Sequence, residues 1–202
     1  MASPQRFPIN TVKIAASYQH IKRQQLQSLL SSYLQSSFFT LPVRRLYTDL
    51  AGLDWANNVQ IERIWPDTLK ITLIEKIPTA TWNNGLITEA GEIFNKGSEL
   101  TDLALPKLKG PNNQEKEVLQ VYKKMSKILT IYGLYASALE WRDNHAWDLT
   151  LANGLQIHLG KRDLEMRITR FCKAYPAVFG ERAEQLMSVD LRYPRGMAVQ
   201  WK

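Results

Sequence analysis

Residues 59–82, VQIERIWPDTLKITLIEKIPTATW, decide how the first part of this chain folds. Apolar and polar residues alternate over residues 59–64 and again over residues 69–74, which is the pattern of half-buried β-strands. The tetrapeptide at 65–68 contains Pro66 and Asp67, which favour a tight turn. The sequence therefore predicts a β-hairpin.

The residues before this hairpin extend it into a small domain. Residues 7–15 read as a first strand, and apolar residues recur at helical spacing over 26–34, with Ser17 expected as the helix N-cap. A second short helix is expected to begin at Pro42 and end at Gly52. The predicted order is strand–helix–helix–strand–strand, with both helices covering one face of a three-stranded sheet.

Pro78 marks the expected domain boundary, because proline is poorly tolerated inside a central strand. We therefore divide the chain into residues 7–77 and residues 78–202. The second part predicts a mostly antiparallel β domain with two helices, so the fold class of the whole chain is α+β.

Turn signals and periodicity outline this second domain. Asn153-Gly154 is the most specific hairpin signal, Asp163 is expected to cap a helix, and Pro176 is expected to kink or end that helix. The segment 106–111 reads as a loop. The expected strands are 79–82, 86–88, 93–94, 137–141, 147–151, 155–159, 186–191 and 197–201, and the first helix covers 118–132.

Composition excludes several classes of function. Lys and Arg exceed Asp and Glu by 26 to 19, an excess that suits acidic partners, anionic membrane surfaces or nucleic acid. The charges are scattered, however, which favours a solvated basic surface. The single cysteine, Cys172, excludes a disulfide framework and is expected to be a buried, inert thiol. The histidines stand in different elements without ligand spacing, so no metal site is expected: His20, His145 and His158.

No catalytic or cofactor-binding motif is present in the sequence, and we expect no enzyme and no cofactor. Glu62 and Glu75 are expected to be exposed carboxylates on a sheet, and Asp148 and Asp190 to be polar groups at strand ends. A charge-free run over residues 24–43 is too rich in Gln, Ser and Thr to cross a bilayer.

A binding surface at the C-terminus is the better hypothesis. The last strand is expected at a sheet edge, where unpaired backbone groups can accept a partner strand. Tyr193 and Trp201 would supply anchors, and Arg192 and Arg195 could meet acidic residues. In the alternative interpretation, which stays open, Tyr193 and Trp201 simply cap the core of the second domain.

Two segments carry a family resemblance. Residues 63–69, RIWPDTL, running into residues 75–82, EKIPTATW, resemble the R-x-W-P-x-x-L…E-x-x-P-x-A-x-W signature of the FtsQ/DivIB cell-division proteins. The ending VDLRYPRG…VQW, residues 189–201, resembles the close of the FtsQ branch. The segments at 91–94 and 159–160, the latter followed by Arg167 and Phe171, match in the same order.

This resemblance implies an N-terminal POTRA domain (β-α-α-β-β) over residues 7–77 and an FtsQ-type β domain over residues 78–202. It also implies a single-pass inner-membrane protein whose extracytoplasmic region, represented by this chain, lies on the periplasmic face at the division septum. The implied function is a non-catalytic divisome scaffold that links early and late division proteins. Its implied partners are FtsB and FtsL for the β domain and FtsK for the POTRA domain.

In the family, FtsB adds a strand beside the last strand of the β domain. An arginine that the family can offer before the strand at Trp147 is replaced here by Asn144, near His145, or its contact moves to Arg142. A transport or outer-membrane assembly factor with a POTRA domain is the main rival, and a nucleic-acid-binding module is a distant third. The resemblance implies these partner-binding residues: Arg192, Tyr193, Gly196, Met197, Ala198, Val199 and Trp201.

Overall fold

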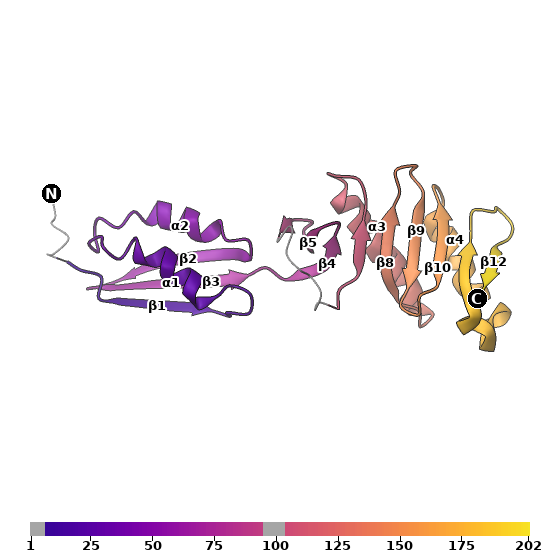
Figure 1. Cartoon of the computed structure of the whole chain (residues 1–202), viewed down its shortest axis with the longest axis horizontal. Coiled ribbons are helices and arrows are strands. Elements are labelled where there is room, and N and C mark those ends of the chain that lie inside the picture. Colours follow the sequence, from indigo (N-terminus) through magenta and orange to yellow (C-terminus); the bar gives the residue numbers. More distant parts are fainter. Residues whose placement is uncertain (1–6, 95–103) are drawn as a thin grey trace. The chain divides into compact units, whose positions relative to one another are not determined.

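The computed structural model describes residues 7–94 and 104–202, and the chain separates into two compact units, Met1–Ile77 and Pro78–Lys202 (Figure 1). Each unit has its own sheet and its own hydrophobic core. Within the described residues, no helix combines the length and apolar character that crossing a membrane requires.

The first unit has the predicted order of elements. Its sheet has the strand order β1-β3-β2, in which β1 runs parallel to β3 and β2 runs antiparallel to it. The predicted hairpin of β2 and β3 is confirmed, as is the strand–helix–helix–strand–strand order. The elements are β1 (Thr11–Ala16), α1 (Arg23–Ser31), α2 (Val43–Ala51), β2 (Ala56–Ile64) and β3 (Thr68–Glu75).

Both helices of this unit bury their apolar stripes against one face of the sheet. Alternate residues of β3 are buried, while Lys70, Thr72 and Ile74 between them are more exposed. The prediction of one covered and one open face is therefore confirmed. The buried side chains that meet in this core include Leu26, Leu30, Leu46, Leu50, Leu69, Ile71 and Leu73.

Two predictions for this unit were wrong for a shared reason. Ser17 does not cap α1, which begins at Arg23 and has no side-chain cap. Glu75 is not an exposed carboxylate; it is 7 % exposed. Its oxygens accept hydrogen bonds from the backbone amides of Gln19, His20 and Ile21, at 3.1, 3.1 and 3.3 Å, so the segment before α1 is held by β3.

Residues of the 63–69 signature contact the segment between α1 and α2. Arg63 Nη2 donates a hydrogen bond to the carbonyl oxygen of Leu41 at 2.8 Å. The Trp65 ring packs edge-to-face against Phe38 and Phe39, with centroid distances of 5.9 and 5.7 Å. This part of the signature thus anchors the loop that leads into α2.

The second unit is built on one mixed sheet with the order β12-β11-β10-β9-β8-β7-β4-β5-β6. A 3₁₀ segment, Gly180–Gln185, leads from α4 into β11. The other elements are β4 (Pro78–Trp82), β5 (Gly85–Thr88), β6 (Ile93–Phe94), β7 (Lys107–Lys109), α3 (Glu115–Ile131), β8 (Ala136–Trp141), β9 (Trp147–Leu151), β10 (Gln156–Gly160), α4 (Leu164–Val178), β11 (Leu186–Asp190) and β12 (Ala198–Trp201).

The α+β class is confirmed, and most strand pairs in this sheet are antiparallel. The interpretation of residues 106–111 as a loop was wrong, because β7 lies there and pairs in parallel with both β4 and β8. Only Leu108 of this three-residue strand is buried, so the segment is too short to show a period in the sequence. Its strand conformation depends on the neighbours on both sides.

Helices α3 and α4 cover one face of this sheet (Figure 1). Asp163 stands at the N-cap position of α4, but its φ is +56° and its side chain makes no capping hydrogen bond. Pro176 does not end α4, which continues to Val178. The core includes Val118, Met125, Leu129, Leu149, Ile157, Ile168, Phe171, Cys172 and Val189.

Candidate partner-binding edge

Strand β12 forms one edge of the large sheet, as predicted for the last strand of the chain. It pairs antiparallel with β11, placing Val199 opposite Val189 and Ala198 opposite Asp190. Among the described residues, no strand pairs with its other side. Backbone donors and acceptors along that side can therefore serve a partner strand.

The two faces of β12 differ in chemistry. Val199 shares a face with the buried Val189, and the Trp201 ring lies 6.2 Å from the Phe179 ring in an edge-to-face contact. Trp201 remains 40 % exposed and Tyr193 is 54 % exposed. Trp201 therefore contacts Phe179 of the core and also keeps exposed surface, and its role in partner binding stays a prediction.

Arg170 of α4 holds the turn that leads into β12. Its guanidinium donates hydrogen bonds to the carbonyl oxygens of Pro194 at 2.6 Å, Tyr193 at 2.9 Å and Leu191 at 3.3 Å. This role could not be predicted from the sequence, because the acceptors are backbone carbonyls more than 20 residues away. By fixing residues 191–194, Arg170 sets the position of Tyr193.

Arg192 is already engaged by Asp190 in the free protein. Its Nε lies 2.9 Å from both carboxylate oxygens of Asp190, and its backbone amide donates to the same group at 3.0 Å. The Arg192 guanidinium holds the pKa of the Asp190 carboxyl below its ordinary value, against the opposing effect of burial. An acidic partner residue would therefore share Arg192 with Asp190.

Asp190 belongs to a row of ionisable side chains across the open face of the sheet. His158 lies between Asp148 on β9 and Asp190 on β11 in the strand register, and its Nδ1 is 2.7 Å from Asp148 Oδ1. Arg142 forms an ion pair with Asp148 at the far end. Asp148 and Asp190 are therefore not simply polar groups at strand ends. Asp148 pairs with Arg142 and His158, and Asp190, opposite His158 in the register, pairs with Arg192.

The neighbours of Arg142 make no such charge contact. Asn144 accepts a hydrogen bond from the backbone amide of Ala146 at 3.0 Å, and His145 lies near the Trp141 ring, at a centroid distance of 6.1 Å. Arg142, Asn144 and His145 are the residues that could take the place of the family's arginine. Of these three, Arg142 carries a guanidinium and lies on this face.

Gly196 leaves open space beside the turn. A Cβ atom built at this position would meet no other atom within 4 Å. A side chain here is therefore compatible with the fold of the chain by itself. Met197, in contrast, is half-buried and packs against the core.

The described residues offer few side chains for metal binding or for thiol chemistry. Within residues 7–94 and 104–202, no cluster of three or more His, Cys, Asp or Glu side chains is placed to bind a metal ion. Cys172 is fully buried, and burial raises the pKa of its thiol to about 11, which keeps it protonated and unreactive.

Fold and edge together define a class of protein: a POTRA domain followed by a β domain that ends in an exposed edge strand. Residues 7–76 match the family model of the FtsQ-type POTRA domain. Residues 80–192 match the model of the C-terminal region of the cell division proteins FtsQ/DivIB. That second match ends at Arg192, just before the turn that leads to β12.

Full-length relatives agree with both matches. The chain is 36% identical over 201 residues to cell division protein FtsQ of Coxiella burnetii, covering 99% of this chain and 83% of that protein. It is 33% identical to the FtsQ proteins of Hahella chejuensis and Shewanella oneidensis, covering 96% of this chain in both and 70% and 74% of those proteins. The chain belongs to the FtsQ/DivIB family of cell division proteins.

Proposed function

We propose that this chain is a non-catalytic scaffold of the division machinery whose β domain binds FtsB, together with FtsL, by strand addition at β12. The observation that carries the proposal is the position of β12, a short and exposed strand at the edge of the sheet. FtsK and other division proteins would contact the POTRA domain. The full-length protein would be anchored in the inner membrane, with this region on its periplasmic face at the septum.

Each proposed site residue has a distinct role. Backbone groups of Ala198 and Val199 would pair with the partner strand, while Tyr193 and Trp201 would supply large, rigid contact surfaces. Arg192 would contribute a charged contact to an acidic partner residue. Gly196 would leave room for the partner backbone, and Met197 would support the strand from the core side.

The test is calorimetric titration of the whole chain with the extracytoplasmic segment of its own FtsB, with and without FtsL. Tyr193→Ala and Trp201→Ala are each expected to weaken binding by about tenfold or more, the effect of removing a hot-spot residue. Gly196→Asp is expected to abolish strand addition while leaving the thermal unfolding of the chain unchanged. Folding of every variant is followed by circular dichroism.

Tyr135→Ala is the matched control, because Tyr135 is 62 % exposed and lies away from this edge. It should bind FtsB like the wild type. The proposal is wrong if the wild-type chain does not bind even with FtsL present, or if Gly196→Asp and Tyr193→Ala bind as tightly as the wild type.

A further inference from the structure

The loop that joins β11 to β12, residues 191–197, carries Tyr193 and has little hydrogen bonding of its own. Apart from the β11–β12 ladder, no backbone–backbone hydrogen bond among the described residues involves residues 192–197. A segment with so few bonds of its own opens easily unless side chains from other elements hold it. The order of this loop therefore depends on contacts from outside the loop.

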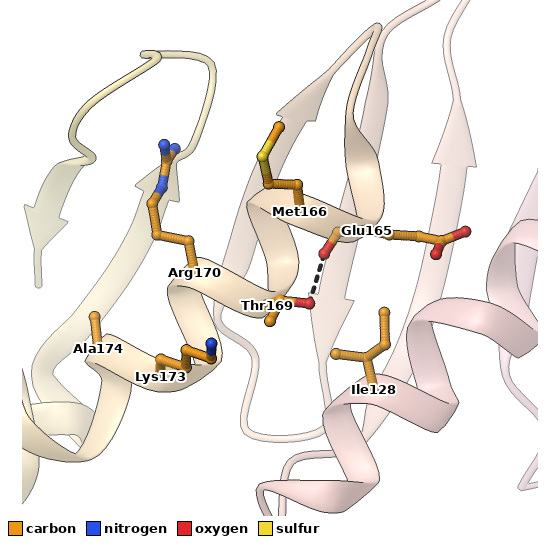
Figure 2. Close-up of a pocket in the computed structure, with 7 residues that line it drawn as sticks. All are labelled: Ile128, Glu165, Met166, Thr169, Arg170, Lys173 and Ala174. Atoms are coloured by element: carbon orange, nitrogen blue, oxygen red, sulfur yellow. Dashed lines mark hydrogen bonds between the residues drawn. The ribbon is translucent and has the colours of Figure 1, made fainter.

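Arg170 of α4 provides contacts of this kind. Figure 2 shows its side chain extending from the helix toward the loop between β11 and β12. Its three acceptors, the carbonyl oxygens of Leu191, Tyr193 and Pro194, span the first half of the loop. The backbone of residues 191–194 is thus held from the helix side, while the Tyr193 side chain remains 54 % exposed.

The environment of Arg170 is not the one that stabilises a folded chain most. Its acceptors in the described structure are neutral carbonyl oxygens, and its Nε is buried without an acceptor among the described atoms. A carboxylate partner would give stronger, charge-assisted hydrogen bonds, and a buried N–H without an acceptor is costly. The evident effect of this arrangement is to fix the loop.

We propose that Arg170 is a positioning residue for strand addition at β12, because it orders the loop before the partner arrives. This inference rests on the proposed function, since it concerns the same edge of the sheet. A loop that becomes ordered only on binding lowers the affinity, and a loop that is ordered beforehand avoids this cost. Arg170 would act through the backbone that carries Tyr193, without touching the partner.

The geometry requires a guanidinium at this position. Nη1 of Arg170 donates to Pro194, and Nη2 donates to Leu191 and Tyr193, so two nitrogen atoms of one planar group reach three acceptors. A lysine ammonium has a single nitrogen and cannot occupy both positions. Arg170→Lys keeps the charge and should therefore hold the loop only in part.

The first measurement uses the free chain. Backbone ¹⁵N relaxation of the whole chain is compared between the wild type, Arg170→Met and Arg170→Lys. In Arg170→Met, the order parameters of residues 192–196 are expected to fall from about 0.85, the value of rigid backbone, to below about 0.6. Arg170→Lys should give a smaller fall. The order parameters of β11 should stay unchanged in both variants.

The second measurement is titration of the same variants with the extracytoplasmic segment of the protein's own FtsB, in the presence of FtsL. Arg170→Met is expected to weaken binding by about tenfold or more, and Arg170→Lys by less. Combining Arg170→Met with Tyr193→Ala tests the route. Because Arg170 acts through Tyr193, the double variant should lose clearly less affinity than the product of the two single effects.

Lys173→Met is the matched control. Lys173 is exposed on the same helix, three residues after Arg170, and its substitution removes the same charge (Figure 2). Both the order parameters of the loop and the affinity for FtsB should equal those of the wild type. Circular dichroism follows the folding of every variant. If Arg170→Met does not fold, Arg170→Lys carries the test, with smaller effects in the same direction.

The inference is overturned if residues 192–196 are as rigid in the Arg170 variants as in the wild type, or if these variants bind FtsB as tightly as a binding wild type. It is also overturned if the effects of Arg170→Met and Tyr193→Ala simply multiply. A wild-type chain that does not bind would refute strand addition itself, whereas the relaxation data would still decide whether Arg170 orders the loop.

Discussion

The carboxylate of Glu75 binds three consecutive backbone amides and the imidazole of His20, which lies 3.1 Å away. Burial alone would raise the pKa of this carboxyl. The hydrogen bonds from Ile21 and His20 outweigh that effect and hold the pKa below its ordinary value. The His20 ring in turn stacks on Trp55 at a centroid distance of 3.6 Å, so Glu75 organises one end of the first unit.

Glu75→Gln is expected to lower the free energy of unfolding of the first unit by about 1–3 kcal/mol at neutral pH, because charge-assisted hydrogen bonds in a buried site are weakened. Urea titration of the whole chain, followed by NMR signals of the first unit, measures this change. Glu62→Gln is the control on the same sheet. Glu62 forms an exposed ion pair with Lys70, and its loss should cost at most about 1 kcal/mol.

The effect of Glu75 should depend on pH in a defined direction. A carboxyl whose folded-state pKa is lowered contributes stability above its unfolded-state pKa of about 4.3, and this stability is lost as the pH falls through the folded-state pKa. The difference between wild type and Glu75→Gln should therefore shrink in acid. A difference that stays constant from neutral pH down to about pH 2 would contradict this assignment.

Cys172 should be chemically silent in the native chain. With a thiol pKa of about 11 and no exposed surface, roughly one thiol in a thousand would be ionised at pH 8 even if solvent could reach it. Iodoacetamide is expected to leave the folded chain unmodified and to label it completely in urea, as mass spectrometry would show. Equal labelling rates in the two states would refute burial of this thiol.

At the scale of elements, the end of β10 and helix α4 are joined through Gly160 and Arg167. Arg167 Nη1 donates to the carbonyl oxygen of Leu159 at 2.6 Å, and Gly160 has a φ of +78°. A Cβ atom at Gly160 would lie 2.6 Å from Arg167 Nη1. The Leu159-Gly160 and Arg167 positions of the family resemblance thus form one structural contact.

Gly160→Ala is expected to lower the free energy of unfolding of the second unit by about 2–3 kcal/mol. Roughly 1–2 kcal/mol comes from left-handed backbone strain, and about 1 kcal/mol comes from the displaced Arg167 hydrogen bond. Urea denaturation measures the total.

Gly154→Ala is the matched control for this substitution. Gly154 has a φ of +87° and open space around its Cβ position, so only the strain should appear. Equal losses of stability in the two variants would show that Arg167 contributes nothing at Gly160.

At the scale of the molecule, each unit buries its own set of apolar side chains, and the two sets share no residue. We therefore propose that residues 7–77 and residues 78–202 are domains that fold independently. Each fragment is expected to give a dispersed NMR spectrum that matches its part of the spectrum of the whole chain, except near the cut. A fragment that stays unfolded while the whole chain is folded would contradict the proposal.

Secondary structure was predicted correctly from the sequence where the spacing of apolar residues repeats over many positions. The β2–β3 hairpin and helix α3 follow from apolar residues repeated over many positions, and the β9–β10 hairpin follows from Asn153-Gly154. The prediction failed at β7, Ser17 and Glu75. There the conformation depends on strands or amides far along the chain, which local spacing cannot reveal.

In the candidate site, too, local features could be predicted from the sequence, whereas contacts between elements could not. The last strand was predicted at a sheet edge, and the strand order confirms that position. The contacts of Arg170 with residues 191–194 and of His158 with Asp148 were missed, because their partners lie on other elements.

The sequence by itself determined the order of strands and helices in the first unit, the α+β class, and the family to which the chain belongs, because these follow from local periodicity and ordered motifs. Only the tertiary structure decided that β7 joins the sheet, that Glu75 is buried, and that Arg170 holds the turn before β12. Each of these depends on residues brought together from distant positions, and such contacts leave no period in the chain.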